Sequence, residues 1–273
     1  MKKWMYNALI ILFAAVFLGS AGYLAYYFIS SHIQQGSYDT LSAIVNSNTV
    51  SPRPSINEDD TVTQVNPYEL VEAIDPETGE TVRVLPQFKA LYEMNNDIVG
   101  WLSIPGTEID YPVMQTPEDR DYYLKHNFDK EYSAHGCLYA REECDINTPS
   151  DNITIYGHRM RDGSMFARLD KYMEKSFWEE NPYIYFDTLN QLHTYKIIAV
   201  FRTTATVDQG FAYHQFVDAE NKAAFDAFVN TCEELALYDT GIDAEYGDKL
   251  ITLSTCEYSQ TNGRLVVVAK RIG

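Results

Sequence analysis

The sequence predicts a mainly β domain with a few inserted helices, preceded by one N-terminal transmembrane helix. Two observations predict this fold class. Short runs rich in Val, Ile, Tyr and Thr recur between turn residues along the C-terminal part of the chain, as in the strands of a β domain. An uncharged apolar segment near the N-terminus is long enough to cross a bilayer. With 273 residues, 45% of them hydrophobic, the chain can bury one sizeable core.

Residues 1–31 are predicted to form a cytoplasmic tip and a membrane helix. No Asp, Glu, Lys or Arg occurs from Trp4 to Ser31, and the apolar stretch from Ala8 to Ile29 can span about 30 Å of hydrocarbon. The two lysines before it place the N-terminus in the cytoplasm and the rest of the chain outside the cell. We expect a single-pass protein of the cell membrane. The alternative is a cleaved signal peptide, processed at the small residues from Gly19 to Gly22.

Residues 32–85 are predicted to form an extracellular stalk or linker. This segment is polar and turn-rich, for example from Ser51 to Pro54, and it has no sustained apolar period. A short helix is expected around Tyr68 to Ala73. The pattern changes at Pro86, where a short amphipathic helix begins, so the folded domain is expected to span residues 86–273.

Eight segments of this domain have the composition and length of strands. They are Ile98 to Ile104, Ile109 to Met114, Cys137 to Ala140, Asn152 to Tyr156, Tyr183 to Phe186, Thr194 to Thr204, Lys249 to Thr255 and Arg264 to Arg271. Apolar residues at helical spacing predict one amphipathic helix from Asp218 to Leu235, with Asp218 as its N-cap. Shorter helices are expected at Ser164 to Met173 and at Ser176 to Asn181.

Charge and cysteine content limit the classes of partner and cofactor. The formal net charge of −18 argues against nucleic acid, whose phosphates require clustered Lys and Arg. Four cysteines without a paired motif do not form a disulfide scaffold, although Cys137 and Cys144 could pair with each other. These two and His135 are also types of zinc ligand, but no clear fourth ligand accompanies them, so we expect neither a metal nor a cofactor.

Three residues at the ends of predicted strands carry the chemistry. Cys256 ends a strand just before a polar turn, where a thiol is placed for exposure. His158 follows another apolar strand, and an imidazole can protonate a leaving amine and later deprotonate a nucleophile. Arg264 opens the last strand, at the same end of a hairpin as Cys256, where its fixed charge can stabilise an oxyanion. Each residue alone is unremarkable, and the combination predicts acyl transfer through a thioester.

These motifs resemble those of the sortase family, in the family's order. The resemblance is carried by the run from Thr252 to Cys256, by Tyr156-Gly157-His158 and by the Arg264 strand, and it extends upstream through Gly100-Trp101-Leu102, Ile109 to Val113, Tyr123-Leu124 and Met165-Phe166. The helix before the cysteine strand makes the sequence most similar to class B sortases. The resemblance implies an eight-stranded β-barrel in which the three motifs meet in one groove. It also implies that Ser254, Thr255, Leu124 and Tyr213 line this groove and bind substrate.

The resemblance further implies a reaction and its partners. Cys256 would attack the Thr carbonyl of a C-terminal sorting signal in a surface-protein precursor, and His158 would protonate the departing amine. An amine of a lipid II-type peptidoglycan precursor, or of a pilin lysine, would then resolve the acyl-enzyme. Two alternatives are a membrane-anchored cysteine peptidase that acts by hydrolysis and a non-catalytic wall-binding domain. The sequence does not identify the sorting signal or the acceptor amine.

Overall fold

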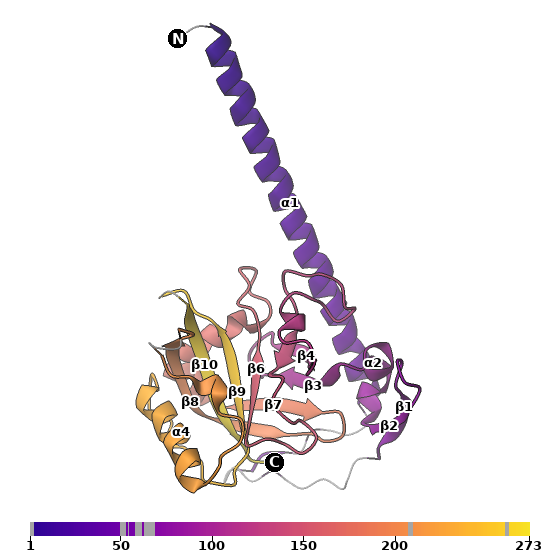
Figure 1. Ribbon diagram of the computed structural model, residues 1–273, viewed down its shortest axis with the longest axis vertical. Coiled ribbons are helices and arrows are strands. Elements are labelled where there is room, and N and C mark those ends of the chain that lie inside the picture. The colour runs from indigo at the N-terminus through magenta and orange to yellow at the C-terminus, as the bar shows by residue number, and fades with distance from the viewer. Residues whose placement is uncertain are drawn as a thin grey trace. The chain divides into compact units, whose positions relative to one another are not determined.

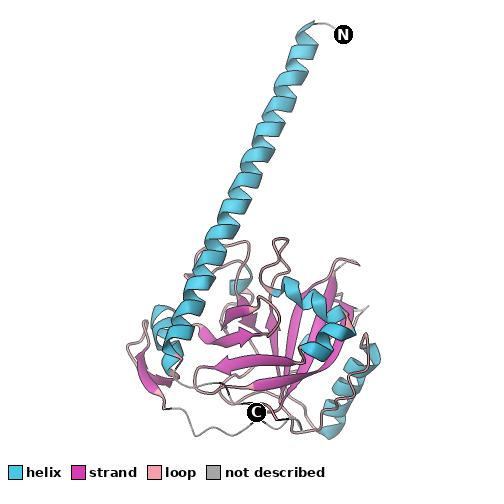
Figure 2. Cartoon of the chain, turned by 180° about the vertical axis from the view of Figure 1, so that it is seen from behind, coloured by secondary structure: helices cyan, strands magenta, loops and turns pink. Residues whose placement is uncertain are grey.

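The computed structural model describes residues 3–49, 53, 55–57, 62, 69–206, 210–259 and 262–273. The chain forms two compact units, Met1–Thr40 and Leu41–Gly273. Figure 1 labels most of the helices and strands, which are numbered in chain order, and Figure 2 shows the strands of the second unit in magenta from behind.

Helix α1 (Lys3–Asn48) contains the predicted membrane segment. Among the described residues it is the one helix that is long and apolar enough to cross a membrane. It continues well past Ser31, into residues expected to form a polar stalk. The continuation has a physical basis, because Leu41 and Val45 lie one helical turn apart and are both buried in the second unit. Two apolar residues one helical turn apart are too few to give a detectable helical period in a polar sequence.

A β-hairpin replaces the helix expected around Tyr68 to Ala73. Strands β1 (Val71–Ile74) and β2 (Thr81–Val84) pair antiparallel, while Tyr68 itself lies outside the described residues. The turn between the two strands favours a hairpin over a helix. The Asp75 carboxylate accepts hydrogen bonds from the amides of Glu77 and Thr78, at 2.8 and 2.9 Å, and Gly79 has a φ of 73°. The boundary expected at residue 86 stays a prediction, although side chains of this hairpin are already buried.

Eight strands close into a barrel, as the resemblance to sortases implied. Their order around the barrel is β10-β8-β7-β3-β4-β5-β6-β9. Their bounds are β3 Ile98–Ser103, β4 Asp110–Met114, β5 Leu138–Ala140, β6 Asn152–Tyr156, β7 Tyr183–Thr188, β8 Thr194–Thr204, β9 Leu250–Cys256 and β10 Gly263–Arg271. Every one of them overlaps a strand predicted from the sequence. Most pairs are antiparallel, but β4 with β5 and β6 with β9 are parallel.

Helices and single turns fill the connections. They are η1 (Pro86–Phe88), α2 (Lys89–Met94), η2 (Tyr122–Leu124), η3 (Phe166–Met173), α3 (Lys175–Glu180), η4 (Tyr213–Gln215) and α4 (Lys222–Leu235). The N-cap predicted for α4 is wrong. Asn221 caps this helix by accepting a bond from the amide of Ala224, whereas Asp218 accepts one from the amide of Asp151. Two residues of the types that cap helices, Asp218 and Asn221, precede the helix, and Asp218 is engaged by the amide of Asp151.

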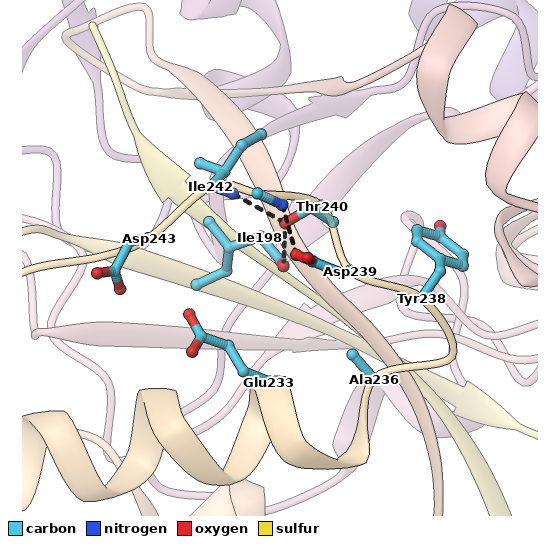
Figure 3. Close-up of a pocket in the computed structure, with 9 residues that line it drawn as sticks. Ile198, Glu233, Ala236, Tyr238, Asp239, Thr240, Ile242 and Asp243 are labelled. Atoms are coloured by element: carbon cyan, nitrogen blue, oxygen red, sulfur yellow. Dashed lines mark hydrogen bonds between the residues drawn. The ribbon is translucent and has the colours of Figure 1, made fainter.

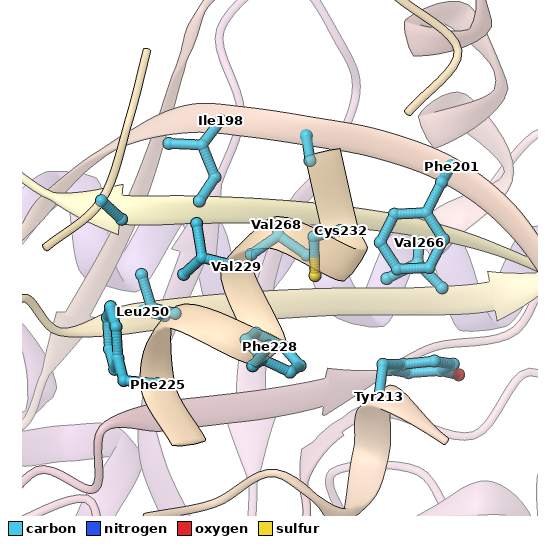
Figure 4. Packing of buried hydrophobic residues seen from close by; sticks show 12 residues of the cluster. Ile198, Phe201, Tyr213, Phe225, Phe228, Val229, Cys232, Leu250, Val266 and Val268 are labelled. Carbon is cyan, nitrogen blue, oxygen red and sulfur yellow. The ribbon is translucent and has the colours of Figure 1, made fainter. Parts of the chain in front are cut away.

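Helix α4 covers part of the outer face of the barrel. Figure 4 shows its buried side chains, Phe225, Phe228, Val229 and Cys232, packed over residues of β8, β9 and β10. On this face Leu250 of β9 and Val266 and Val268 of β10 belong to the same buried cluster. Because side chains alternate along a strand, this contact identifies which residues of β9 and β10 point outward.

Candidate active site

The register of three neighbouring strands brings the three predicted catalytic residues to the same end of the barrel. Cys256, the last residue of β9, lies directly opposite Arg264 of β10. Strand β6 runs parallel to β9, with Tyr156 opposite Ser254. His158 follows Tyr156 by two residues, as Cys256 follows Ser254, so both residues lie two positions beyond the last pair of this register. The sequence placed each residue at a strand end, and the register places them at the same end.

The thiol of Cys256 lies on the outer face of the barrel. It is an even number of residues from Leu250, which packs under α4, so the two side chains share that face. Of the four cysteines, all within the described residues, Cys256 alone is partly exposed. Cys137, Cys144 and Cys232 are buried, and burial raises the pKa of the Cys144 thiol to about 11. Of the four thiols, that of Cys256 is therefore the one accessible from solvent, as a reactive cysteine requires.

The imidazole of His158 is held by a main-chain acceptor. Its Nε2 lies 2.7 Å from the carbonyl oxygen of Leu124. A carbonyl oxygen can only accept, so Nε2 carries the hydrogen and Nδ1 is left as the nitrogen that exchanges a proton. The preceding residue has no room for a side chain: a Cβ on Gly157 would come within 2.5 Å of Leu138 Cδ2 and 2.7 Å of Phe166 Cδ2. The glycine therefore allows the chain to pass close to both.

The guanidinium of Arg264 bonds to its own loop. Its Nη1 donates to the carbonyl oxygens of Gly263, at 3.0 Å, and Asn262, at 3.4 Å, and Asn262 has a left-handed φ of 54°. The charges of Arg264 and Cys256 both influence the pKa of the Tyr213 phenol. Burial raises the pKa of Tyr213, while its bond with Ser254 and the charge of Arg264 oppose the rise and the thiol adds to it. Tyr213 therefore lies close to the proposed catalytic residues.

The residues predicted to bind substrate are largely enclosed. The Tyr213 hydroxyl and Ser254 Oγ are 2.6 Å apart, and both residues are buried. Thr255, 2% exposed, donates its hydroxyl to the carbonyl oxygen of Gly157. Leu124 is partly exposed and contributes the carbonyl that holds His158. Their role in substrate binding stays a prediction, and each of them contacts the catalytic residues or their neighbours.

One nearby residue was left unassigned by the sequence. His214 follows Tyr213 in η4, and burial lowers its pKa, with further lowering from the charges of Arg141 and Arg264. A lone histidine in a loop carries no signal of its own. Only the fold reveals that His214 and Arg264, which are distant in sequence, lie on the same side of the barrel.

Cys137 and Cys144 are both in the thiol form, so the disulfide that the sequence left open is not formed. The Cys144 thiol donates to the carbonyl oxygen of Asn152 at 3.4 Å, and His135 Nε2 lies 2.9 Å from the carboxylate of Asp162. Within the described part of the chain, no group of three His, Cys, Asp or Glu residues is arranged to hold a metal ion.

A separate pocket of about 420 Å³ lies beside the C-terminal end of α4. Figure 3 shows that its lining comes from α4, from the loop after it and from β8, and none of the three predicted catalytic residues takes part. The lining residues are Ile198, Glu233, Ala236, Tyr238, Asp239, Thr240, Gly241, Ile242 and Asp243.

Comparisons with known proteins agree with this fold. The family model of the sortase domain matches residues 102–272. The chain belongs to the sortase family. Sortase B of Staphylococcus aureus is 33% identical over 191 residues, which cover 69% of this chain and 76% of that protein. Sortase B of Listeria monocytogenes is also 33% identical, over 197 residues covering 71% and 78%.

Solved structures place this sortase in class B. A Staphylococcus aureus sortase B–substrate complex superposes with a TM-score of 0.71 at 26% identity, covering 89% of this chain and 98% of that one. Sortase B from B. anthracis in complex with AAEK1 gives a TM-score of 0.69 at 30% identity, with the same coverage. The protein is therefore a class B sortase-type cysteine transpeptidase, an enzyme of cell-wall sorting.

Proposed function

We propose that Cys256 is the nucleophile of this transpeptidase, His158 its general acid and base, and Arg264 its oxyanion stabiliser. The observation that supports the proposal is the register: Arg264 pairs with Cys256, and β6, which runs parallel to β9, ends two residues before His158 at the same end of the barrel. The partial exposure of Cys256 and the Leu124 carbonyl at His158 Nε2 support it.

The reaction follows from these roles. The Cys256 thiolate attacks the carbonyl carbon of the scissile peptide bond, and the carbonyl electrons move to an oxyanion that Arg264 stabilises. As the oxyanion collapses, the C–N bond breaks and His158 gives its proton to the departing amine, which leaves a thioester. An incoming amine then loses a proton to His158 and attacks the thioester carbon, which forms a new amide and releases the thiolate.

The donor substrate is the sorting signal of a surface-protein precursor, cleaved after Thr. The acceptor is an amine of a lipid II-type peptidoglycan precursor or of a pilin lysine. Two solved relatives support these classes: one is a sortase B–substrate complex, and another sortase B, 32% identical, was solved complexed with triglycine, a peptide that ends in a free amine. Both substrates lie outside the cell, as does the barrel if α1 spans the membrane with its N-terminus in the cytoplasm.

The test is mass spectrometry of the full chain in detergent micelles, incubated with a library of sorting-signal peptides and triglycine. We expect an acyl adduct on Cys256 and its conversion to the triglycine amide, with neither product for Cys256→Ala. Release of the free acid alone, unchanged by triglycine, would indicate a hydrolase. No adduct with any peptide would contradict the proposal.

A further inference from the structure

Thr255 lies between the nucleophile and Ser254, but its side chain points to the other face of β9. Because side chains alternate along a strand, Ser254 and Cys256 share the outer face and Thr255 points into the barrel. It is 2% exposed. Its Oγ1 donates a hydrogen bond of 2.8 Å to the carbonyl oxygen of Gly157. The hydroxyl is therefore already engaged inside the protein, away from the face that carries the thiol.

The acceptor of this bond belongs to the peptide unit that leads into His158. The carbonyl carbon of Gly157 is bonded to the backbone nitrogen of His158, so the hydroxyl of Thr255 fixes the plane of that peptide. The register of β6 with β9 ends at the pair Tyr156 and Ser254. Beyond it, the amide of Gly157 donates to the Ser254 carbonyl at 3.2 Å, and Thr255 holds the Gly157 carbonyl. Both polar groups of Gly157 are thus bound to the two residues that precede Cys256.

Two further contacts hold the rest of His158. Its carbonyl oxygen accepts a bond of 2.9 Å from the amide of Phe166, and its Nε2 donates to the Leu124 carbonyl. Apart from the bond made by the His158 ring itself, the bond from the Thr255 hydroxyl is the one in this set that a side chain makes. A substitution of Thr255 can therefore remove this bond without altering the main chain.

We infer that Thr255 is a positioning residue, whose hydroxyl ties the strand of the nucleophile to the peptide that carries the acid–base imidazole. The inference rests on the proposed roles of Cys256 and His158. In this role Thr255 does not contact the substrate, as the sequence had suggested it would, but acts on the reaction indirectly through His158. Thr255 sets the position of the Nδ1 proton donor relative to the thiol.

The test compares Thr255→Val, which keeps the shape and removes the hydroxyl, with Thr255→Ser, which keeps the hydroxyl. Thr252→Val is the matched control, since Thr252 is also buried in β9 and donates its hydroxyl to Asn152 Oδ1 at 2.8 Å, away from His158. A small displacement of a catalytic group lowers turnover by about 10- to 100-fold. We expect a kcat loss of that size for Thr255→Val with little change in KM, and near-normal kcat for Thr255→Ser and Thr252→Val.

A second substrate separates positioning from substrate binding. In a thiophenyl ester of the same sorting signal, the leaving thiolate needs no proton, so acylation does not depend on the general acid. If Thr255 acts through His158, Thr255→Val slows acylation by the thioester much less than it slows the reaction of the peptide amide. We expect the fold-loss in rate to be at least about ten times smaller for the thioester. Equal defects on the two substrates would assign Thr255 to substrate contact and overturn the inference.

The remaining outcomes are also decisive. Normal turnover of Thr255→Val, or failure of Thr255→Ser to restore a loss, would overturn the positioning role. Thermal unfolding of all three variants shows whether a loss reflects folding, and an equal kcat loss in Thr252→Val would reduce the effect to general destabilisation. Wild type and Cys256→Ala are assayed in parallel. If these two do not differ, the proposed function fails, whereas a dead Cys256→Ala beside a normal Thr255→Val rejects only the role of Thr255.

Discussion

At the scale of single residues, the spacing of catalytic groups depends on residues that carry no chemistry. Gly157 is one of them, because it lies against Leu138 and Phe166 with no space for a Cβ. Its two main-chain polar groups are bound to β9. A side chain at this position therefore has to displace either the packed neighbours or the peptide unit that leads into His158.

Gly157→Ala is expected to impair catalysis more than folding. Overpacking of this kind costs about 1–3 kcal/mol of stability. Because the strain acts directly on the residue before His158, we expect kcat to fall by about 100-fold. Thermal unfolding and steady-state kinetics on a sorting-signal peptide measure the two effects. Unchanged kcat in a folded Gly157→Ala protein would show that the close packing does not hold the imidazole.

At the scale of elements, the strands were predictable and several of their surroundings were not. Each barrel strand has a run of β-branched and aromatic residues between turn signals, as in β8 and β10, so local composition was sufficient to predict the strands. The β1–β2 hairpin consists of four-residue strands, too short for a period to show. The α4 cap depended on Asp151, which is remote in sequence from the helix.

In the candidate site, too, the identity of the residues was predictable from the sequence, whereas their surroundings were not. Cys256, His158 and Arg264 were predicted because each residue type occurs at a strand end and the order matched a known family. The enclosure of Ser254, Thr255 and Tyr213 was not predictable, since it depends on the face of β9 that η4 covers and on the parallel pairing of β6 with β9. Long-range strand pairing places these side chains, and a single sequence does not reveal that pairing.

The contact between α4 and the loop after it predicts a pH dependence of stability. Partial desolvation raises the pKa of the Glu233 carboxyl above its ordinary value of 4.5, although the residue is exposed, and the charges of Asp243 and Asp239 raise it further (Figure 3). A carboxyl whose pKa is raised by folding stabilises the fold while protonated, and this contribution is lost as the pH rises through the folded pKa. At neutral pH the ionised Glu233 therefore opposes folding.

We expect Glu233→Gln to raise the melting temperature at about pH 7, with the gain vanishing near pH 4. Glu234→Gln is the control, because it removes the same charge from the next residue of α4, which does not line the pocket between this helix and the loop after it. Thermal unfolding monitored by circular dichroism at a series of pH values measures both. A gain of equal size in the two variants would attribute the effect to net charge, and a loss in Glu233→Gln would contradict the predicted sign.

At the scale of the whole molecule, one N-terminal helix and one barrel determine where the chemistry takes place. The helix is long and apolar enough to span a membrane, and the chain continues from it into the unit that carries the thiol. Because Cys256 is partly exposed and the other three cysteines are buried, it can report the side of the membrane on which the barrel lies. The thiol that performs the proposed reaction is thus also a probe of topology.

A membrane-impermeant maleimide should label Cys256 in intact cells whose wall has been loosened, and Cys256→Ala should remain unlabelled. A cysteine added directly after Met1, in the Cys256→Ala background, should react only after the membrane is permeabilised, because the two lysines that follow it hold the N-terminus in the cytoplasm. Labelling of that cysteine in intact cells would invert the topology. Its absence from the mature protein even after permeabilisation would show that the helix is removed as a signal peptide.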